Sequence, residues 1–483
     1  MTSGHGPSWR ALAAHVTPQW FRDAKFGIYT HWGVYCVPAC GKNATWYPYY
    51  MYREGNPQYD HHMKTYGGPA KFGYKDFIPM FGAEKFDPDE WAELFKKAGA
   101  RFAGPVGEHH DGFAMWDSDL TEWNAAKMGP KRDVVGELER AIRGQNMRFL
   151  IALHHAENWW FYPHWEAKLD VSDPRYAGLY GPNHNQEWAK GIPASETRDG
   201  EWELQDKPSK DYLDRWAAKT REVVDKYRPD MLWFDNGLRL IQEQYKREML
   251  AYYYDRATEW GKGVVVTYKH HDLAPGAGVA DLELGRMGEL TYNEWITDTS
   301  VDDQGAWGYV QDAGVKPVTA LVHNLVDNVS KNGYMLLNVG PKPNGEIPEP
   351  AKECLLGIGK WLEVNGEAIF DTTAWMIYGE GPTQMKRTGH FSERDEVDYT
   401  AKDIRITAKD DVLYATCLGW PVSEVTIESF KTLYPSEIRS VEMLGVDSKL
   451  EWSLTGDGLK VKPPSNRPCE HAYVFKITRG APF

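Results

Sequence analysis

The sequence predicts an α/β fold, a (β/α)8-like TIM barrel followed by a C-terminal antiparallel β-sandwich. Up to about residue 350, short apolar runs alternate with amphipathic stretches, which is the pattern of βαβ units around a parallel sheet. Beyond about residue 365, short segments of alternating apolar and polar residues are separated by turn residues, as is typical of a sandwich. The 483 residues suffice for one barrel of roughly 250 residues or more and a smaller domain.

Seven apolar runs are the candidate barrel strands. They are rich in β-branched and aromatic residues and nearly continuous, which fits strands buried on both faces. No Gly-rich phosphate loop follows the first of them, so a barrel is favoured over an open nucleotide-binding sheet. The runs are 26–33, 101–113, 147–160, 230–237, 263–272, 278–286 and 332–341.

Amphipathic stretches between the runs predict the helices. Asp87 and Asp89 suit a helix N-terminus, where carboxylates cap backbone N–H groups and favour the helix dipole. The predicted helices are 87–100, 134–147, 210–227 and 245–262, and a helix over 348–370 closes the barrel region. The segment 162–210, rich in Tyr, Pro, Asn, Asp and Gly, is expected to be a long insertion in the barrel.

The C-terminal region carries the predicted sandwich strands. They lie within residues 403–418, 423–430, 436–444 and 472–478. We therefore expect a catalytic barrel domain over residues 1–368 and a β-sandwich domain over residues 369–483.

The composition restricts the partners and the compartment. A formal net charge of −14 argues against nucleic acid or an anionic membrane as a partner. No stretch approaches the roughly 18 apolar residues of a membrane span. The N-terminus has no apolar run typical of a signal peptide, so we expect a cytoplasmic protein, or a periplasmic or secreted one where a signal has been removed. The sequence leaves association into a homo-oligomer open.

Polar residues follow several of the apolar runs directly, as in HWG, EHHDGF, HHAENWW, FDNG and YKHHD. In barrels the active site is built at the C-terminal ends of the strands, so these residues are expected to share one site. The chain also has 21 Trp and 27 Tyr residues. Such aromatic residues suit either a large core or a pocket that stacks against sugar rings.

Asp235, directly after MLWF, is the leading candidate for a nucleophile. A turn aspartate before Asn-Gly would look the same in sequence. Trp233, two residues earlier, shares its strand face and suits a sugar site. Retaining glycoside hydrolysis needs a second carboxyl group about 5–5.5 Å away. Glu283 and Glu294 are the candidates, and Asp281, Glu289 and Asp298 are weaker ones.

Five histidines lie at predicted strand ends: His31, His109, His110, His154 and His155. They could bind a divalent metal, or hydrogen-bond to sugar hydroxyl groups. Adjacent histidines in a strand point to opposite faces, so each pair offers one to a common site unless the strand bends. The HxH spacing usual in barrel metal sites is missing from these strand ends, so we expect no metal.

Several segments together resemble the glycoside hydrolase family 29 α-L-fucosidases. They are 20–33, 108–125, 229–237, 306–309 and 329–348, within a resemblance that covers most of residues 15–370. The resemblance implies a (β/α)8-like barrel with a C-terminal β-sandwich, and release of α-L-fucose with retention. It also implies no metal or other cofactor, and a fucosylated glycan or glycoconjugate as substrate.

The resemblance also implies roles for single residues. His31 resembles a fucose-binding histidine of the family, and His109 and His110 resemble its paired histidines. Trp233 and Asp235 resemble the Trp and the nucleophilic Asp of the WFD motif.

This chain departs from the family pattern around the pocket. Thr45 stands where a Glu often precedes the Trp-Tyr pair that includes Trp46, and Glu108 stands where a Lys is usual. His154 and His155 replace a Tyr-rich strand end, and Lys269 lies in TYKHHD where Asn and Arg are more usual. We expect Trp46, His154, His155 and Lys269 to contact substrate.

The predicted function is hydrolysis of terminal α-L-fucosides, or of a closely related sugar, by double displacement. Asp235 is the expected nucleophile. Glu283 is the first choice for the acid/base, because a strand end holds a carboxyl group more firmly than the open loop expected around Glu294. Arg286 could instead pair with Glu283. The alternatives are a metal-dependent barrel hydrolase and a non-catalytic carbohydrate-binding relative.

Overall fold

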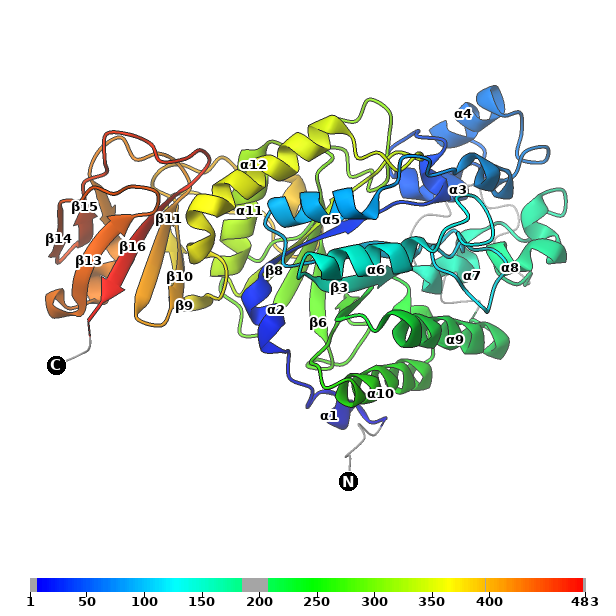
Figure 1. Cartoon of the computed structure of the whole chain (residues 1–483), viewed down its shortest axis with the longest axis horizontal. Coiled ribbons are helices and arrows are strands. Elements are labelled where there is room, and N and C mark those ends of the chain that lie inside the picture. The colour runs from blue at the N-terminus through cyan, green and yellow to red at the C-terminus, as the bar shows by residue number, and fades with distance from the viewer. Residues whose placement is uncertain (1–6, 185–206, 396, 481–483) are drawn as a thin grey trace.

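The computed structural model describes residues 7–184, 207–395 and 397–480. Eight parallel strands close into a barrel in chain order (Figure 1). They are β1 (Phe26–Thr30), β2 (Phe102–Glu108), β3 (Arg148–Leu153), β4 (Met231–Phe234), β5 (Val265–Lys269), β6 (Val279–Glu283), β7 (Trp295–Ser300) and β8 (Gly333–Val339). The predicted barrel is therefore confirmed.

Strand β7 is an element that the sequence analysis assigned to a loop. All six of its residues are buried, and it pairs with β6 on one side and β8 on the other. The residues Thr297, Asp298 and Thr299 make the segment look polar. Two of them are buried with hydrogen-bond partners inside the barrel. Thr297 donates to the carbonyl of Leu282 at 2.6 Å, and Tyr29 donates to Asp298 at 3.0 Å.

In the described parts of the chain, six long helices pack around the strands (Figure 1). Predicted among them are α5 (Pro88–Lys97), α6 (Val134–Gly144), α9 (Lys210–Tyr227), α10 (Glu243–Glu259) and α12 (Glu349–Asn365), whereas α11 (Val318–Ser330) was not predicted. Asp87 caps α5, as expected, by accepting from the backbone N–H groups of Asp89 and Glu90. Short helices are α1 (Trp9–Leu12), α2 (Gln19–Ala24), α3 (Tyr47–Tyr50), α4 (Pro57–Thr65), α7 (Asn158–Phe161) and α8 (Ala177–Tyr180).

The predicted insertion over 162–210 is described only in part, because residues 185–206 lie outside the described residues. Its first part, up to residue 184, contains α8 and two 3-10 turns. Its last residue is the first of α9.

Two antiparallel sheets follow the barrel, in agreement with the predicted sandwich. One has the order β13-β16-β11-β10-β9 and the other β12-β15-β14. Their strands are β9 (Thr373–Glu380), β10 (Ile404–Lys409), β11 (Val412–Cys417), β12 (Val425–Ile427), β13 (Ile438–Met443), β14 (Trp452–Thr455), β15 (Gly458–Val461) and β16 (Tyr473–Arg479). The division between residues 368 and 369 stays a prediction, and the first sheet strand beyond it begins at Thr373.

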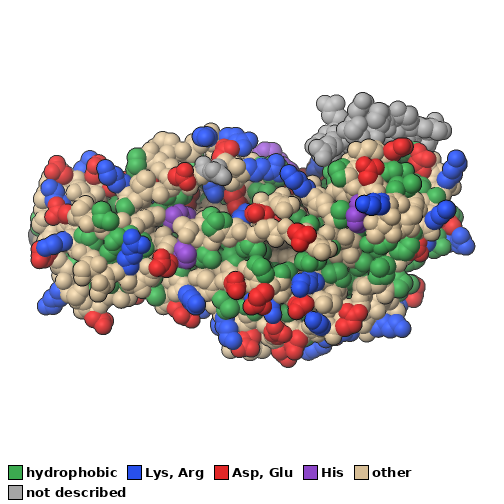
Figure 2. All heavy atoms as spheres, turned by 90° about the horizontal axis from the view of Figure 1, so that it is seen from above, with side chains coloured by type: hydrophobic (Ala, Val, Ile, Leu, Met, Phe, Trp, Pro, Cys, Tyr) green, Lys and Arg blue, Asp and Glu red, His purple; other side chains and the backbone are tan. Residues whose placement is uncertain are grey.

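Helix α11 lies between the barrel and the larger sheet, where it contacts β9 and β10 (Figure 1). Asp327 of α11 forms an ion pair with Arg405 of β10, and both side chains are buried, with 1% and 6% of their surface exposed. Charged groups of both signs are scattered over the face seen from above, so the negative net charge forms no single-sign field there (Figure 2). Among the described residues, no helix combines the length and hydropathy needed to cross a membrane.

Candidate active site

A cavity of about 380 Å³ opens at the C-terminal ends of the barrel strands. That volume is within the range of small-molecule sites. Seven of the predicted site residues line it: His31, Trp46, His109, His154, Trp233, Asp235 and Glu283. The lining also includes Asn43, Thr45, Tyr50, Asn236, Leu284, Asp298, Gly305, Trp307, Phe391 and Arg394. Carboxyl groups, histidines and tryptophans from separate strands therefore meet in one place.

Asp235 directly follows β4, and its side chain faces histidines from two other strand ends. His154 Nδ1 donates to Asp235 Oδ2 at 3.1 Å, and His110 Nε2 lies 3.5 Å from the same oxygen. Burial by itself would raise the pKa of Asp235. The neighbouring His154, His110 and Lys269 outweigh it and hold that pKa well below its ordinary value. Asp235 is therefore an ionised carboxylate at the cavity wall.

Glu283, the last residue of β6, has the opposite electrostatic setting. Burial raises its pKa to about 7, and the nearby Asp298 and Asp235 add to the rise, while Lys269 opposes it. Asn236 Nδ2 lies 3.4 Å from Glu283 Oε2. The competing ion pair with Arg286 is not formed, because the guanidinium of Arg286 turns to the carbonyl oxygen of Asp395 at 3.5 Å. Near neutral pH, the carboxyl group of Glu283 is therefore present in both its protonated and its ionised form.

Glu294, the alternative acid/base candidate, does not reach the cavity. It precedes β7, at the N-terminal end of the barrel, whereas the cavity lies at the C-terminal ends. Its Oε1 is 2.7 Å from Arg22 Nε and accepts from the Tyr334 hydroxyl at 3.3 Å. Glu294 was a wrong candidate because the loop that carries it leads into the N-terminal end of β7, at the end of the barrel opposite the cavity.

Two expected substrate contacts are also wrong in position. His155 turns away from the cavity, and its Nε2 points to the carbonyl of Trp216 at 3.4 Å. Lys269 lies fully buried beneath the site, where its ammonium group donates to Asp281 at 2.8 Å and to Asp298. Two buried carboxylates hold this cation inside the barrel, so it acts on the site through charge and not by contact.

The two histidine pairs lie differently, although the chain turns soon after both strands, into a 3-10 helix at His155 and a turn at His110. Strand β3 ends at Leu153, and the next two residues, His154 and His155, alternate in direction as expected. Strand β2 ends at Glu108 and the chain turns at once, so His109 lines the cavity while His110 approaches Asp235.

Three of the histidines are uncharged and offer lone pairs. Burial lowers the pKa values of His31, His109 and His154. His31 Nδ1 donates to Asn338 Oδ1 at 2.8 Å, which leaves Nε2 of its neutral ring as an acceptor. His110 differs, because Glu157 and Asp235 outweigh the effect of burial and raise its pKa.

These lone pairs suit the predicted ligand, sugar hydroxyl groups, and also the alternative weighed against it, a metal ion. The ligand atoms of His31, His109 and His154 all lie within 4.8 Å of one another, and so do those of His110, His154 and Asp235. Neutral imidazole is a common metal ligand and an equally good hydrogen-bond acceptor.

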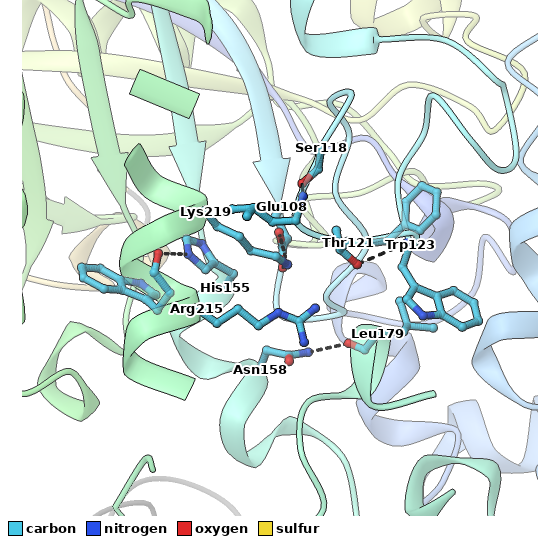
Figure 3. A network of polar contacts seen from close by, with 12 residues as sticks. Glu108, Ser118, Thr121, Trp123, His155, Asn158, Leu179, Arg215 and Lys219 are labelled. Carbon is cyan, nitrogen blue, oxygen red and sulfur yellow. Dashed lines mark hydrogen bonds and ion pairs between the residues drawn. The ribbon is translucent and has the colours of Figure 1, made fainter. Parts of the chain in front are cut away.

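Behind the histidines, one face of α9 holds the segment that carries them (Figure 3). Lys219 donates to both oxygens of Glu108, at 2.6 and 2.8 Å, and both side chains are buried. Four residues earlier, Arg215 donates to the carbonyl of Gly178 at 2.6 Å. Asn158 donates to the carbonyl of His110 at 2.9 Å. Glu108, where the family usually has Lys, therefore has its own cation in this chain.

We expect Lys219→Met to lower the free energy of unfolding by about 3–5 kcal/mol, because it leaves the Glu108 carboxylate buried without its cation. Denaturant unfolding measures the change. Lys97→Met is the matched control: Lys97 also pairs with a glutamate at 2.6 Å but is 60% exposed, so its loss should cost less than about 0.5 kcal/mol. An equal effect of the two substitutions would contradict the burial argument.

Among the other lining residues, Asp298 had been only a weaker carboxyl candidate, and Trp307, Phe391 and Arg394 were not predicted as site residues. Asp298 is on the strand that was not predicted, and Trp307 was noted only as part of the motif at 306–309. Phe391 and Arg394 belong to the connection between β9 and β10, within the predicted sandwich region. We found no sequence pattern that predicts the return of this connection to the barrel mouth.

Comparisons with known proteins find matches over nearly the whole chain. The family model described as alpha-L-fucosidase matches residues 2–367, and the model of the alpha-L-fucosidase C-terminal domain matches residues 395–478. A tissue alpha-L-fucosidase of Bos taurus is 33% identical over 494 residues, covering 98% of this chain and 91% of that protein. A plasma alpha-L-fucosidase of Homo sapiens is 31% identical, with 98% and 92% covered.

The solved structures give the same similarity. A crystal structure of Thermotoga maritima alpha-fucosidase in complex with fucose matches with a TM-score of 0.75 and 29% identity. The match covers 98% of this chain and 100% of that one. A second structure of the Thermotoga enzyme, with a mechanism-based inhibitor, matches with a TM-score of 0.74 and 29% identity, with 98% and 99% covered.

Proposed function

The chain belongs to the alpha-L-fucosidase family of glycoside hydrolases, and on this premise we propose that it hydrolyses terminal α-L-fucosides with retention, Asp235 acting as nucleophile and Glu283 as acid/base. One observation carries the proposal. Two of the carboxyl groups that line the cavity have surroundings that drive their pKa values apart, that of Asp235 far down and that of Glu283 up to about 7. Such a pair supplies an ionised nucleophile and a protonated acid together.

In the first step, an Asp235 oxygen attacks the anomeric carbon as the bond to the leaving oxygen breaks. Glu283 gives its proton to that oxygen, and a fucosyl ester on Asp235 forms. In the second step, Glu283 removes a proton from water, which attacks the same carbon and releases Asp235. Two displacements at one carbon return the original configuration.

The remaining lining residues supply sugar contacts in this proposal. His31, His109 and His154 offer ring nitrogens to the hydroxyl groups, while Trp46 and Trp233 offer apolar faces to the ring and its methyl group. The substrate is then a fucosylated glycan or glycoconjugate.

We expect His31→Ala and His110→Ala to weaken transition-state binding by about 2–4 kcal/mol, which is the scale of losing a polar contact in a closed site. His31 would lose a hydrogen bond to sugar, and His110 the support of Asp235. The measurement is kcat/KM on an aryl α-L-fucoside. A change of less than about 0.5 kcal/mol in both variants would contradict these roles.

The raised pKa of Glu283 sets the expected pH dependence. Below about pH 7 its carboxyl group is protonated, and above that value the proton needed by the leaving group is lost. For a fucoside with a poor leaving group, kcat/KM should therefore fall as the pH rises through about 7. The Glu283→Gln variant should lose this limb of the profile. If the limb persists unchanged in that variant, another group, such as His110, causes it.

The two histidine clusters favour one alternative, a metal-dependent hydrolase. Turnover of an aryl α-L-fucoside before and after dialysis against chelator tests it, with elemental analysis of the active protein. Our proposal expects unchanged turnover and α-L-fucose as the first product by NMR. Loss of activity restored by zinc, or stoichiometric zinc in the active protein, would favour the metal enzyme. No turnover at all would favour a non-catalytic relative.

A further inference from the structure

We propose that Phe391 and Arg394 form a leaving-group subsite that selects fucosides carrying an anionic group, a carboxylate or a sulfate, next to the fucose. Both residues line the cavity, although they come from the connection between β9 and β10. The inference rests on the proposed role of Glu283. An acid/base touches the leaving-group oxygen, so residues held beside Glu283 at the cavity mouth face the group that leaves.

The segment 389–394 is attached to the backbone of Glu283 on both sides. The Glu283 N–H donates to His390 Nδ1 at 3.1 Å, and the Phe391 N–H donates to the Glu283 carbonyl at 2.7 Å. Two residues after Phe391, the Glu393 N–H donates to the carbonyl of Leu284 at 2.8 Å. The segment, whose residues Ser392–Arg394 form a 3-10 turn, is therefore held against the end of β6.

Side chains fix the segment in place as well. Glu393 accepts from Thr299 at 2.9 Å and from Lys316 at 2.7 Å. Phe391 has a φ of 59°, a left-handed conformation that is unusual for a bulky residue. Strained residues of this kind cluster at functional sites, where the surrounding structure holds them. The contacts around Phe391 thus hold a preformed surface at the cavity mouth.

Arg394 gives this surface its charge. Among the described residues that line the cavity it is the single Lys or Arg, while the carboxyl groups of Asp235, Glu283 and Asp298 are the acidic ones. Its guanidinium lies over the Phe391 ring, 4.6 Å from the centroid, and the residue is exposed. Within the described parts of the chain, no carboxylate lies within ion-pair distance of it. A guanidinium in this position is free to bind a carboxylate or sulfate through two hydrogen bonds.

A nearby arginine shows the contrast. Arg387 belongs to the same connection, but its guanidinium is occupied by Asp395, at 2.6 and 2.8 Å, and it does not line the cavity. Arg387→Gln removes the same charge from the same region without touching the subsite. It is the matched control for Arg394→Gln.

The test compares matched pairs of aryl α-L-fucosides, one pair carrying a carboxylate or its amide and another a sulfate ester or the free hydroxyl. For each protein we take the ratio of kcat/KM for the anionic member to that for the neutral member. Arg394→Gln should lower this ratio about fivefold, near the upper limit for an exposed charge pair. Arg394→Lys should lower it less, Arg387→Gln should leave it unchanged, and 0.5 M salt should lower the wild-type ratio. The two pairs show whether carboxylate or sulfate is preferred.

An unchanged ratio in Arg394→Gln would overturn the inference, and so would an equal fall in Arg387→Gln, because only a long-range field would then be acting. Calorimetric titration of the same fucosides into Asp235→Ala measures the preference without turnover. It should show the same loss of anion preference when Arg394→Gln is added. Neutral fucosides turned over without Asp235 would contradict the proposed function instead, so the two failures are distinguishable.

Discussion

Asp235→Ala is expected to remove nearly all turnover of aryl α-L-fucosides while the protein stays folded. The carboxylate forms the covalent bond in the proposed mechanism, and losing such a nucleophile costs several orders of magnitude in rate. The fold should survive because the side chain faces a cavity, His110 keeps its hydrogen bond to the carbonyl of His154, and the His154 ring still stacks on His109. Steady-state kinetics and thermal unfolding measure both effects. More than about a tenth of the wild-type rate would contradict the assignment.

Azide gives this variant a second readout. With the carboxyl group removed, azide can enter the space it leaves and attack the anomeric carbon from the same side. The product should be a fucosyl azide of inverted configuration, identified by NMR. An azide product of retained configuration would mean that another group still forms the intermediate.

The second large effect is expected for Glu283→Ala, and its size should depend on the leaving group. Fucosides with poor leaving groups need the proton of Glu283, so they should lose about 10²–10⁴-fold in rate. Activated aryl fucosides need little protonation and should still form the intermediate. Azide should then speed the second step and give a fucosyl azide of retained configuration. Rate constants across a series of aryl leaving groups measure this dependence.

Glu294→Ala is the matched control, because it removes a carboxylate from the opposite end of the barrel. It should change stability through Arg22 and leave the dependence on leaving group as in the wild type. If Glu294→Ala showed the dependence and Glu283→Ala merely destabilised the protein, the choice of acid/base would be wrong.

The barrel could be predicted because its strands are apolar runs that end in polar residues, as in MLWF before Asp235. Strand β7 escaped prediction because Thr297, Asp298 and Thr299 are polar yet buried. Their burial depends on partners such as Tyr29, which lies 269 residues away in sequence. Local sequence patterns do not contain such long-range hydrogen bonds.

The same limit explains the misplaced site residues. Missing β7 made Glu294 look like a candidate at the rim, although the strand it precedes starts at the other end of the barrel. Lys269 stands at a strand end, but the two carboxylates that draw it inside, Asp281 and Asp298, come from two other strands. Phe391 and Arg394 reach the cavity from the predicted sandwich region, which only the tertiary fold reveals.

Trapping the intermediate tests the central claim most directly. A 2-deoxy-2-fluoro fucosyl donor with a good leaving group should label the protein, because the fluorine slows the second step by disfavouring the cationic transition state. Mass spectrometry of the digested protein should then find one fucosyl adduct, on the peptide that contains Asp235, and none in Asp235→Ala. A label on another residue, or turnover without any adduct and with β-L-fucose as the first product, would contradict retention through Asp235.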